Sequence, residues 1–300
     1  MDEAKRYTKL EKLGEGGFGS VYRAKDEVNN NIVSMKVIPL DMEIDGITSS
    51  CLREISAMKA FDHPNIVKCL NTIVTSEKAV IISEFMEMSL RKFLCMKSPM
   101  DPELVRSYSY QMLCGIAYMH SHHYLHRDIK PENLLINRTG MLKIADFSLA
   151  RSFGIPLTQM TPNVTTLWYR PPEIVLGSTF YDIGIDSWSA GCVIAEMIKK
   201  SPLFVGDSDL DQAFGIFKIL GTPEEYWPEN AVISADVFPE MEKKDLGGVL
   251  NIQDPDLIDL ITKLLSIDPN KRLTARDALD HPYFSKISPQ LADFCRPSFD

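Results

Sequence analysis

The sequence lacks the features that stabilise or target a protein outside a reducing compartment. Its six cysteines, at 51, 69, 95, 114, 192 and 295, form no CxxC pair, which indicates small apolar side chains and not a disulfide framework. The N-terminus has no apolar stretch typical of a secretory signal. The longest apolar run, residues 190–198, contains Glu196 and is far too short to cross a bilayer. We therefore expect a protein of the nucleus or the cytoplasm that has no membrane partner.

Positive charge is also scarce. Asp and Glu number 41 against 32 Lys and Arg, so the formal net charge is −9. Binding to a phosphate backbone requires a basic face, so this balance argues against a nucleic-acid partner. Hydrophobic residues make up 45% and charged residues 24% of the chain, which excludes a disordered protein and is typical of a globular one.

The pattern of hydrophobic residues changes near residue 85. Before it, β-branched and aromatic runs predict five strands, at 7–14, 20–24, 32–38, 66–74 and 79–85. Apolar residues that recur every three positions predict one helix, at 50–61. Beyond residue 86 we expect helices over 102–122, 186–199, 209–220, 255–265 and 274–279, with short strands at 134–136 and 142–144. The sequence thus predicts an α+β protein with a small β-rich lobe, 1–84, and a hinge and larger α-helical lobe, 85–300.

A glycine-rich motif lies between the first two strands. Residues 14–21 spell GEGGFGSV and run into a second strand instead of a helix, which favours a hairpin that covers phosphates over a dinucleotide fingerprint. Glycine lets backbone N–H groups approach phosphate oxygens, although a plain glycine hairpin remains open on this motif alone. Lys36 follows on the next strand and is a candidate phosphate ligand, with Glu54 on the helix to hold it. Taken alone, Lys36 would be an ordinary solvated lysine.

Further motifs follow in the second lobe. Residues 126–133 spell HRDIKPEN, residues 146–148 spell DFS, and Pro172 and Glu173 close the intervening segment, 146–173. Together with the glycine motif and Lys36, these elements follow the order of the protein-kinase signature set. The chain therefore resembles eukaryotic-type protein kinases over essentially its whole length, residues 1–300, and this resemblance implies a bilobal kinase-like fold.

The resemblance also implies ATP and Mg²⁺ as cofactors and assigns roles to the motif residues. Asp128 would accept the proton of an attacking hydroxyl, Lys130 would neutralise the γ-phosphate, and Asn133 and Asp146 would hold Mg²⁺. Lys130 is also typical of serine/threonine kinases. The residues expected to contact ATP are Leu13, Gly14, Glu15, Gly16, Gly17, Phe18, Gly19, Val21, Ser34, Lys36, Ser83, Glu84, Met86 and Leu135.

Several segments narrow the resemblance to cyclin-dependent kinases. These are TLWYRPPE at 166–173, GDS at 206–208, DQ at 211–212, LGTP at 220–223 and DPNKR at 268–272. In that family Glu173 pairs with Arg272, and Asp186 supports the catalytic loop. The resemblance implies cell-cycle or transcription control, a cyclin-like regulatory subunit and substrates with Ser/Thr-Pro. It also implies an activating kinase that phosphorylates Thr161, and the cations expected to receive that phosphate are Arg53, Arg127 and Arg151.

Departures from the family leave alternatives open. Residues 48–54, TSSCLRE, keep only part of the helix sequence that grips a cyclin, so a cyclin-independent kinase is one alternative. A mitogen-activated kinase is another, but no Thr-x-Tyr pair lies between Asp146 and Glu173. Ser148 replaces a usual Gly, which together with the altered helix would suit a pseudokinase scaffold. Against this, every residue expected to touch phosphate, metal or hydroxyl is present.

Overall fold

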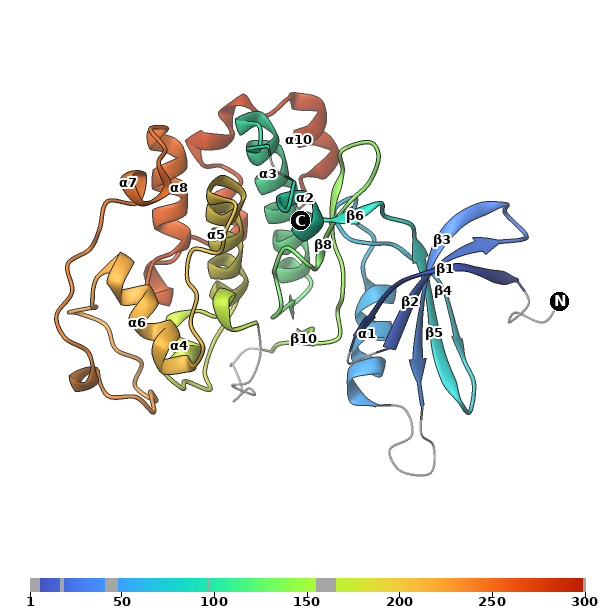
Figure 1. The fold of residues 1–300 in the computed structure, drawn as a ribbon, viewed down its shortest axis with the longest axis horizontal. Coiled ribbons are helices and arrows are strands. Elements are labelled where there is room, and N and C mark those ends of the chain that lie inside the picture. The colour runs from blue at the N-terminus through green and yellow to red at the C-terminus, as the bar shows by residue number, and fades with distance from the viewer. Residues whose placement is uncertain (1–5, 17–18, 41–47, 97, 155–165, 299–300) are drawn as a thin grey trace.

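The computed structural model describes residues 6–16, 19–40, 48–96, 98–154 and 166–298. Figure 1 shows an antiparallel sheet at one end of the molecule and a larger helical part at the other. The predicted two-part α+β architecture is therefore confirmed. None of the helices in these ranges is long and apolar enough to cross a membrane.

Five strands form the N-terminal sheet in the order β1-β2-β3-β5-β4. They are β1 (Tyr7–Gly16), β2 (Gly19–Asp26), β3 (Asn31–Pro39), β4 (Cys69–Val74) and β5 (Lys78–Glu84). All five were predicted, but the fourth was expected to begin at residue 66. It begins at Cys69 because Ile66 forms an isolated bridge with Ile144 of the helical part.

Strand alternation decides which side chains of β3 face the helical part. Val33 and Met35 are buried in an apolar cluster with residues of β2 and β5. Because successive side chains of a strand point to opposite faces, Ser34 and Lys36 face the other way. In the register of the sheet, Ser34 lies opposite Ser83 of β5.

Helix α1 (Ser49–Ala60) lies between the sheet and the helical part (Figure 1). The Thr48 hydroxyl caps it by accepting a hydrogen bond from the Cys51 backbone N–H at 3.3 Å. Cys51 and Met58 are buried in the main core of the protein, and Glu54 is buried on the same side of the helix. The periodicity at 50–61 thus predicted this helix to within one residue at each end.

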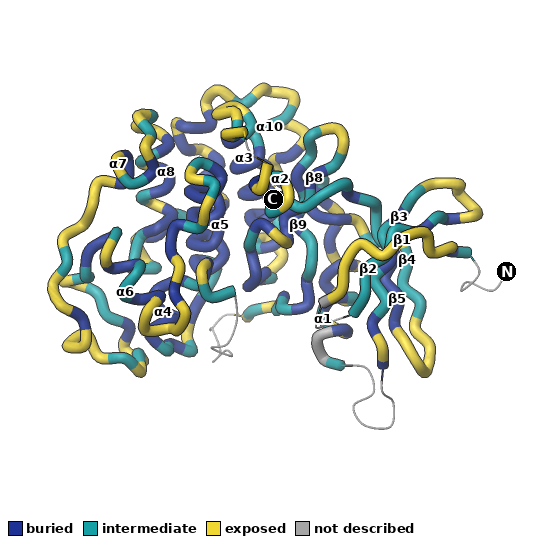
Figure 2. Tube along the Cα trace, viewed as in Figure 1, coloured by how far each residue is buried: buried dark blue, intermediate teal, exposed yellow. Residues whose placement is uncertain are grey.

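The helical part packs around α3 (Pro102–Ser121) and α5 (Gly184–Lys199), where the buried residues gather in Figure 2. The predicted helices α6 (Asp209–Leu220), α8 (Pro255–Leu264) and α9 (Ala275–Ala278) are present, as are the strands β8 (Leu134–Ile136) and β9 (Leu142–Ile144). Short elements that were not predicted are α2 (Leu90–Leu94), α4 (Pro172–Val175), α7 (Leu246–Leu250), α10 (Pro289–Cys295), β6 (Met88–Ser89), β7 (Tyr124–Leu125) and β10 (Arg151–Ser152). The same holds for the 3₁₀ turns η2 (Leu167–Tyr169), η3 (Ala235–Val237), η4 (Pro269–Lys271) and η5 (Pro282–Lys286).

A buried histidine should make the stability of this fold pH-dependent. His63 Nδ1 accepts a hydrogen bond from the Asn65 N–H at 3.1 Å, so its Nε2–H donates to the Cys295 carbonyl at 2.9 Å. Burial lowers the pKa of His63 to about 4 from 6.5. The unfolded chain therefore binds this proton at higher pH, and the stabilisation is complete above pH 6.5 and lost as the pH falls toward 4. We expect His63 to contribute about 2 kcal/mol of the stability lost between about pH 7 and pH 5.

Urea unfolding of the wild type and of His63→Gln at both pH values tests this expectation. The variant should lose less stability on acidification than the wild type. His123→Asn is the control, because His123 is exposed and has a φ of 59°, which Asn tolerates. An equal acid-induced loss in the wild type and His63→Gln would contradict the assignment.

Candidate active site

Three elements bring a lysine and two carboxylates together beside the sheet. Lys36 Nζ of β3 donates to Glu54 Oε1 and Oε2 of α1 at 2.6 and 2.8 Å, and it lies 3.4 Å from Asp146 Oδ1. Burial opposes the charge of Lys36, but Glu54 and Asp146 outweigh it and raise its pKa. Lys36 is thus a fixed ammonium group and not a solvated strand lysine, and Glu54 is the partner that the sequence suggested.

Asp146 is held by the core residue that follows it. Phe147 is fully buried and packs against Phe61, the residue that follows α1, and against His126, with ring centroids 5.6 and 5.4 Å apart. Asp146 itself adopts a left-handed φ of 62°, and its side chain is 34% exposed. Burial opposes ionisation, but Lys36 and then Ser148 lower the pKa of Asp146. The carboxylate is therefore ionised and open on one side.

Asp128 is oriented by four donors. Its Oδ1 accepts from the Thr166 N–H and hydroxyl at 3.2 and 3.1 Å. Its Oδ2 accepts from Asn133 Nδ2 at 2.9 Å and forms an ion pair with Lys130 Nζ at 2.8 Å. Lys130 Nζ also donates to the Thr166 hydroxyl at 2.8 Å. The arrangement places an ammonium group, a hydroxyl and an amide around one fixed carboxylate.

Asp186 of α5 anchors the loop that carries Asp128. The buried Asp186 carboxylate accepts from the His126 and Arg127 N–H groups at 2.9 and 2.8 Å. His120 Nε2 of α3 lies 2.9 Å from the same carboxylate. Burial opposes the charge, but His120 and the His126 N–H lower the pKa of Asp186. This support of the loop by Asp186 agrees with what the family resemblance implies, as does the bidentate contact of Arg272 with Glu173 at 2.7 and 2.8 Å.

The glycine motif forms a β-hairpin, as its context predicted, in which Gly16 lies opposite Gly19. Gly19 has a φ of 127°, and a Cβ there would lie 2.3 Å from the Val37 carbonyl oxygen, so only glycine fits. Leu13, Gly14, Glu15 and Val21 lie on the same two strands. Gly17 and Phe18 lie outside the described residues.

The other expected ATP contacts lie on the inner strands β3 and β5 of the sheet and at the start of the helical part. Ser34 and Ser83 are opposite each other, and Met86 is buried just after β5. Glu84 accepts from the Lys68 N–H at 2.8 Å and from Lys143 Nζ at 2.7 Å. Leu135 is half-buried in β8.

The expected phosphate-binding arginines come from three segments of the chain, namely the loop after β7, strand β10 and helix α1. Arg127 Nε donates to the Leu149 carbonyl at 2.7 Å, and its Nη1 donates to the Tyr181 hydroxyl at 3.1 Å. Arg151 of β10 pairs with Leu125 of β7, two residues before Arg127. Arg53 lies on α1 beside Glu54. Thr161 lies outside the described residues, so its expected contact with these arginines stays a prediction.

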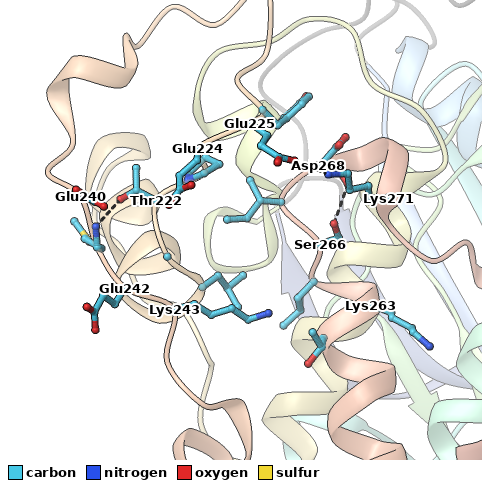
Figure 3. Close-up of a pocket in the computed structure, with 18 residues that line it drawn as sticks. Thr222, Glu224, Glu225, Glu240, Glu242, Lys243, Lys263, Ser266, Asp268 and Lys271 are labelled. Atoms are coloured by element: carbon cyan, nitrogen blue, oxygen red, sulfur yellow. Dashed lines mark hydrogen bonds and ion pairs between the residues drawn. The ribbon is translucent and has the colours of Figure 1, made fainter.

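A groove of about 690 Å³ lies elsewhere in the helical part (Figure 3). It is lined by residues 220–226, at and after the end of α6, by residues 240–243, and by the end of α8 together with the segment after it. Its charged lining residues are Glu224, Glu225, Glu240, Glu242, Lys243, Lys263, Asp268 and Lys271. None of the residues around Lys36 or Asp128 contributes to this lining, so the groove is separate from the candidate active site.

The structure adds two residues to which the sequence analysis gave no role. Thr166 touches Asp128 and Lys130, and His120 supports Asp186. Thr166 is the first residue of the TLWYRPPE segment, and this motif was the only sequence feature that could have pointed to a role for it.

Among the residues described, no group of three or more His, Cys, Asp or Glu is arranged to hold a metal ion.

Lys36 thus lies beside the partly exposed carboxylate of Asp146, and a second carboxylate, Asp128, is held by its donors in the loop whose His126 packs against Phe147, next to Asp146. The family model of the protein kinase domain matches residues 7–284. The match includes the glycine hairpin, the Lys36–Glu54 pair, the Asp128 loop and the Arg272–Glu173 pair. The chain therefore belongs to the protein kinase domain family.

Proposed function

We propose that this kinase transfers the γ-phosphoryl group of Mg-ATP to serine and threonine hydroxyls of proteins. The observation that carries the proposal is the setting of Asp128, whose carboxylate is fixed by Asn133, Lys130 and Thr166. A carboxylate in this position can orient a hydroxyl and accept its proton. Lys130 supplies positive charge beside it, where charge develops on the transferred group.

The residues present also fit a magnesium ion with its nucleotide. Asn133 Nδ2 donates to Asp128, which leaves the amide oxygen of Asn133 as an acceptor. Asp146 offers a partly exposed, ionised carboxylate. Mg²⁺ prefers oxygen ligands and is commonly bound by one or two side chains together with substrate phosphates. When bound, the ion neutralises phosphate charge, while Lys36, held by Glu54, binds the phosphates from the side of the sheet.

The test is transfer of phosphate from Mg-ATP to a peptide library with Ser, Thr or Tyr acceptors, using the purified full chain. We expect incorporation into the Ser and Thr peptides. Incorporation confined to Tyr peptides would overturn the proposed acceptor class, and failure to transfer to any acceptor, including protein mixtures, would overturn the activity.

We further propose that the kinase is of the cyclin-dependent type. Leu52 of α1 and Leu70 and Val74 of β4 are 47–50% exposed, and α1 packs against β4. This apolar surface, next to the helix that holds Glu54, suits a cyclin-like subunit that fixes α1 in place. The TLWYRPPE segment supports a preference for substrates that have Pro directly after the phosphorylated residue. Thr161 is the proposed site of phosphorylation by an activating kinase. If a monomeric preparation were as active as the native complex, the proposed requirement for a cyclin-like subunit would be wrong.

A further inference from the structure

The chain itself contains five Ser-Pro or Thr-Pro dipeptides, which have the acceptor sequence favoured by the proposed function. They begin at Ser98, Thr161, Ser201, Thr222 and Ser288. Thr161 lies outside the described residues. The structure distinguishes the other four by the contacts of their hydroxyl groups.

Two of these hydroxyl groups are engaged in the fold. Thr222 Oγ1 donates to the Pro239 carbonyl at 2.8 Å. Ser288 Oγ accepts from the Leu291 N–H at 3.3 Å and caps α10. Phosphorylation of either residue would first have to break these contacts, so neither is a ready acceptor.

Ser98 is the more accessible of the two remaining residues. Within the described part of the chain, neither the Ser98 nor the Ser201 hydroxyl forms a hydrogen bond, and both residues are exposed. Pro99 is exposed as well and lies in the irregular segment between α2 and α3. Pro202, in contrast, is half-buried, and Leu203 is 5% exposed. An acceptor segment has to enter the active site of another molecule, so the packed segment after Ser201 is unsuited to this role.

A lysine directly after α5 lies beside Ser98. Lys200 Nζ donates to the Ser98 carbonyl at 3.0 Å. The Lys200 N–H donates to the Glu196 carbonyl at 2.8 Å and ends α5, which fixes the backbone that carries this side chain. An ammonium group has three N–H donors, and Lys200 forms no ion pair with a carboxylate of the described residues. Its charge is therefore available for an anion on Ser98.

We propose that Ser98 is a phosphorylation site of this kinase and that Lys200 receives the phosphate. Ser98 Oγ of one copy bonds to the γ-phosphorus of ATP on a second copy. The bond from that phosphorus to the β,γ-bridging oxygen breaks, ADP leaves, and the hydroxyl proton passes to the Asp128 carboxylate of the second copy. The phosphate adds about −1.5 to −2 charges beside Lys200, so it ties the segment between α2 and α3 to the end of α5. This inference rests on the proposed transfer to Ser-Pro acceptors.

The first test uses Asp128→Asn as the acceptor, because this variant lacks the carboxylate needed to phosphorylate itself. Wild-type kinase and Mg-ATP are incubated with isotopically labelled Asp128→Asn, and mass spectrometry locates the phosphate on the labelled chain. We expect Ser98 to be phosphorylated and Ser201 to stay unmodified, and Asp128→Asn/Ser98→Ala to lose the modification. If the wild type phosphorylates Ser-Pro peptides but leaves Ser98 unmodified, or modifies Ser201 equally, the inference is wrong.

The second test needs no phosphoryl transfer. Phosphoserine is encoded at position 98 during expression, and a ³¹P NMR titration measures the second pKa of its phosphate, which is ordinarily about 6. Lys200 should lower this pKa, so Lys200→Gln should raise it by about 0.5 or more. Lys199→Gln is the control, because Lys199 is exposed, precedes Lys200 and carries the same charge. The same pKa with and without the Lys200 side chain, or an equal rise in both variants, overturns the role of Lys200.

The two tests separate this inference from the proposed function. Absence of transfer by the wild type to every acceptor would overturn the proposed function. The NMR titration still decides whether Lys200 receives a phosphate on Ser98.

Discussion

Asp128→Asn is expected to lower phosphoryl transfer by about 10³-fold or more and to leave Mg-ATP affinity within about twofold of the wild type. The amide keeps the size of the carboxylate but cannot accept the proton of the acceptor hydroxyl. It also places an NH₂ group where Asp128 now accepts from Asn133 and Lys130 or from Thr166. Steady-state kinetics on a peptide and calorimetric titration with Mg-ATP measure the two quantities.

Asp146→Asn is the matched comparison, because it makes the same chemical change at the other carboxylate. Asp146 lies 3.4 Å from Lys36, and its side chain is 34% exposed. We therefore expect this variant to lose both phosphoryl transfer and Mg-ATP affinity. If both variants lose ATP affinity to the same degree, the division of roles between Asp128 and Asp146 is wrong.

The sequence predicted the long elements and the protein kinase family because both signals are local. The period of α1, the alternation of β3 and the order of the HRDIKPEN and DFS motifs are each contained in a short window. The partner of Lys36 was also predictable, since Glu54 is the acidic residue of the apolar-striped helix that comes next in the chain. Several short elements, such as β10 and α10, were missed because so few residues define no clear period, although the short strands β8 and β9 were predicted.

Contacts between segments that are distant in the sequence were harder to predict from the sequence. Nothing in the spacing of Arg91 and Glu196, 105 residues apart, indicates that they meet. Their contact depends on how α2 packs beside α5, which the local pattern of neither helix specifies. His120 shows the same limit, since it lies among four histidines of residues 120–126, and only the fold reveals that its partner is Asp186. The pair of Arg272 and Glu173 was accessible through the family resemblance and not through the pattern of residues.

Breaking the buried ion pair of Arg272 and Glu173 should have the largest effect on the stability of the fold. Arg272→Ala is expected to lower the free energy of unfolding by about 3–5 kcal/mol, because it leaves the Glu173 carboxylate buried without a cation. The two side chains are 0% and 3% exposed. Arg272 also donates to the Gly184 carbonyl at 3.1 Å and the Ser266 carbonyl at 2.9 Å, so the substitution leaves buried backbone acceptors unpaired as well. Urea unfolding at neutral pH measures the loss.

Lys271→Ala is the control for this prediction, since Lys271 precedes Arg272 and also forms an ion pair, with Glu225 at 3.2 Å. Both partners of that pair are more than 60% exposed, so its removal should cost less than about 1 kcal/mol. Arg272→Met/Glu173→Leu removes both buried charges and should be more stable than Arg272→Ala, because no uncompensated carboxylate is left. If Arg272→Ala and Lys271→Ala were equally stable, the buried pair would not be what anchors α4, and the end of the 146–173 segment would have to be held by its apolar contacts alone.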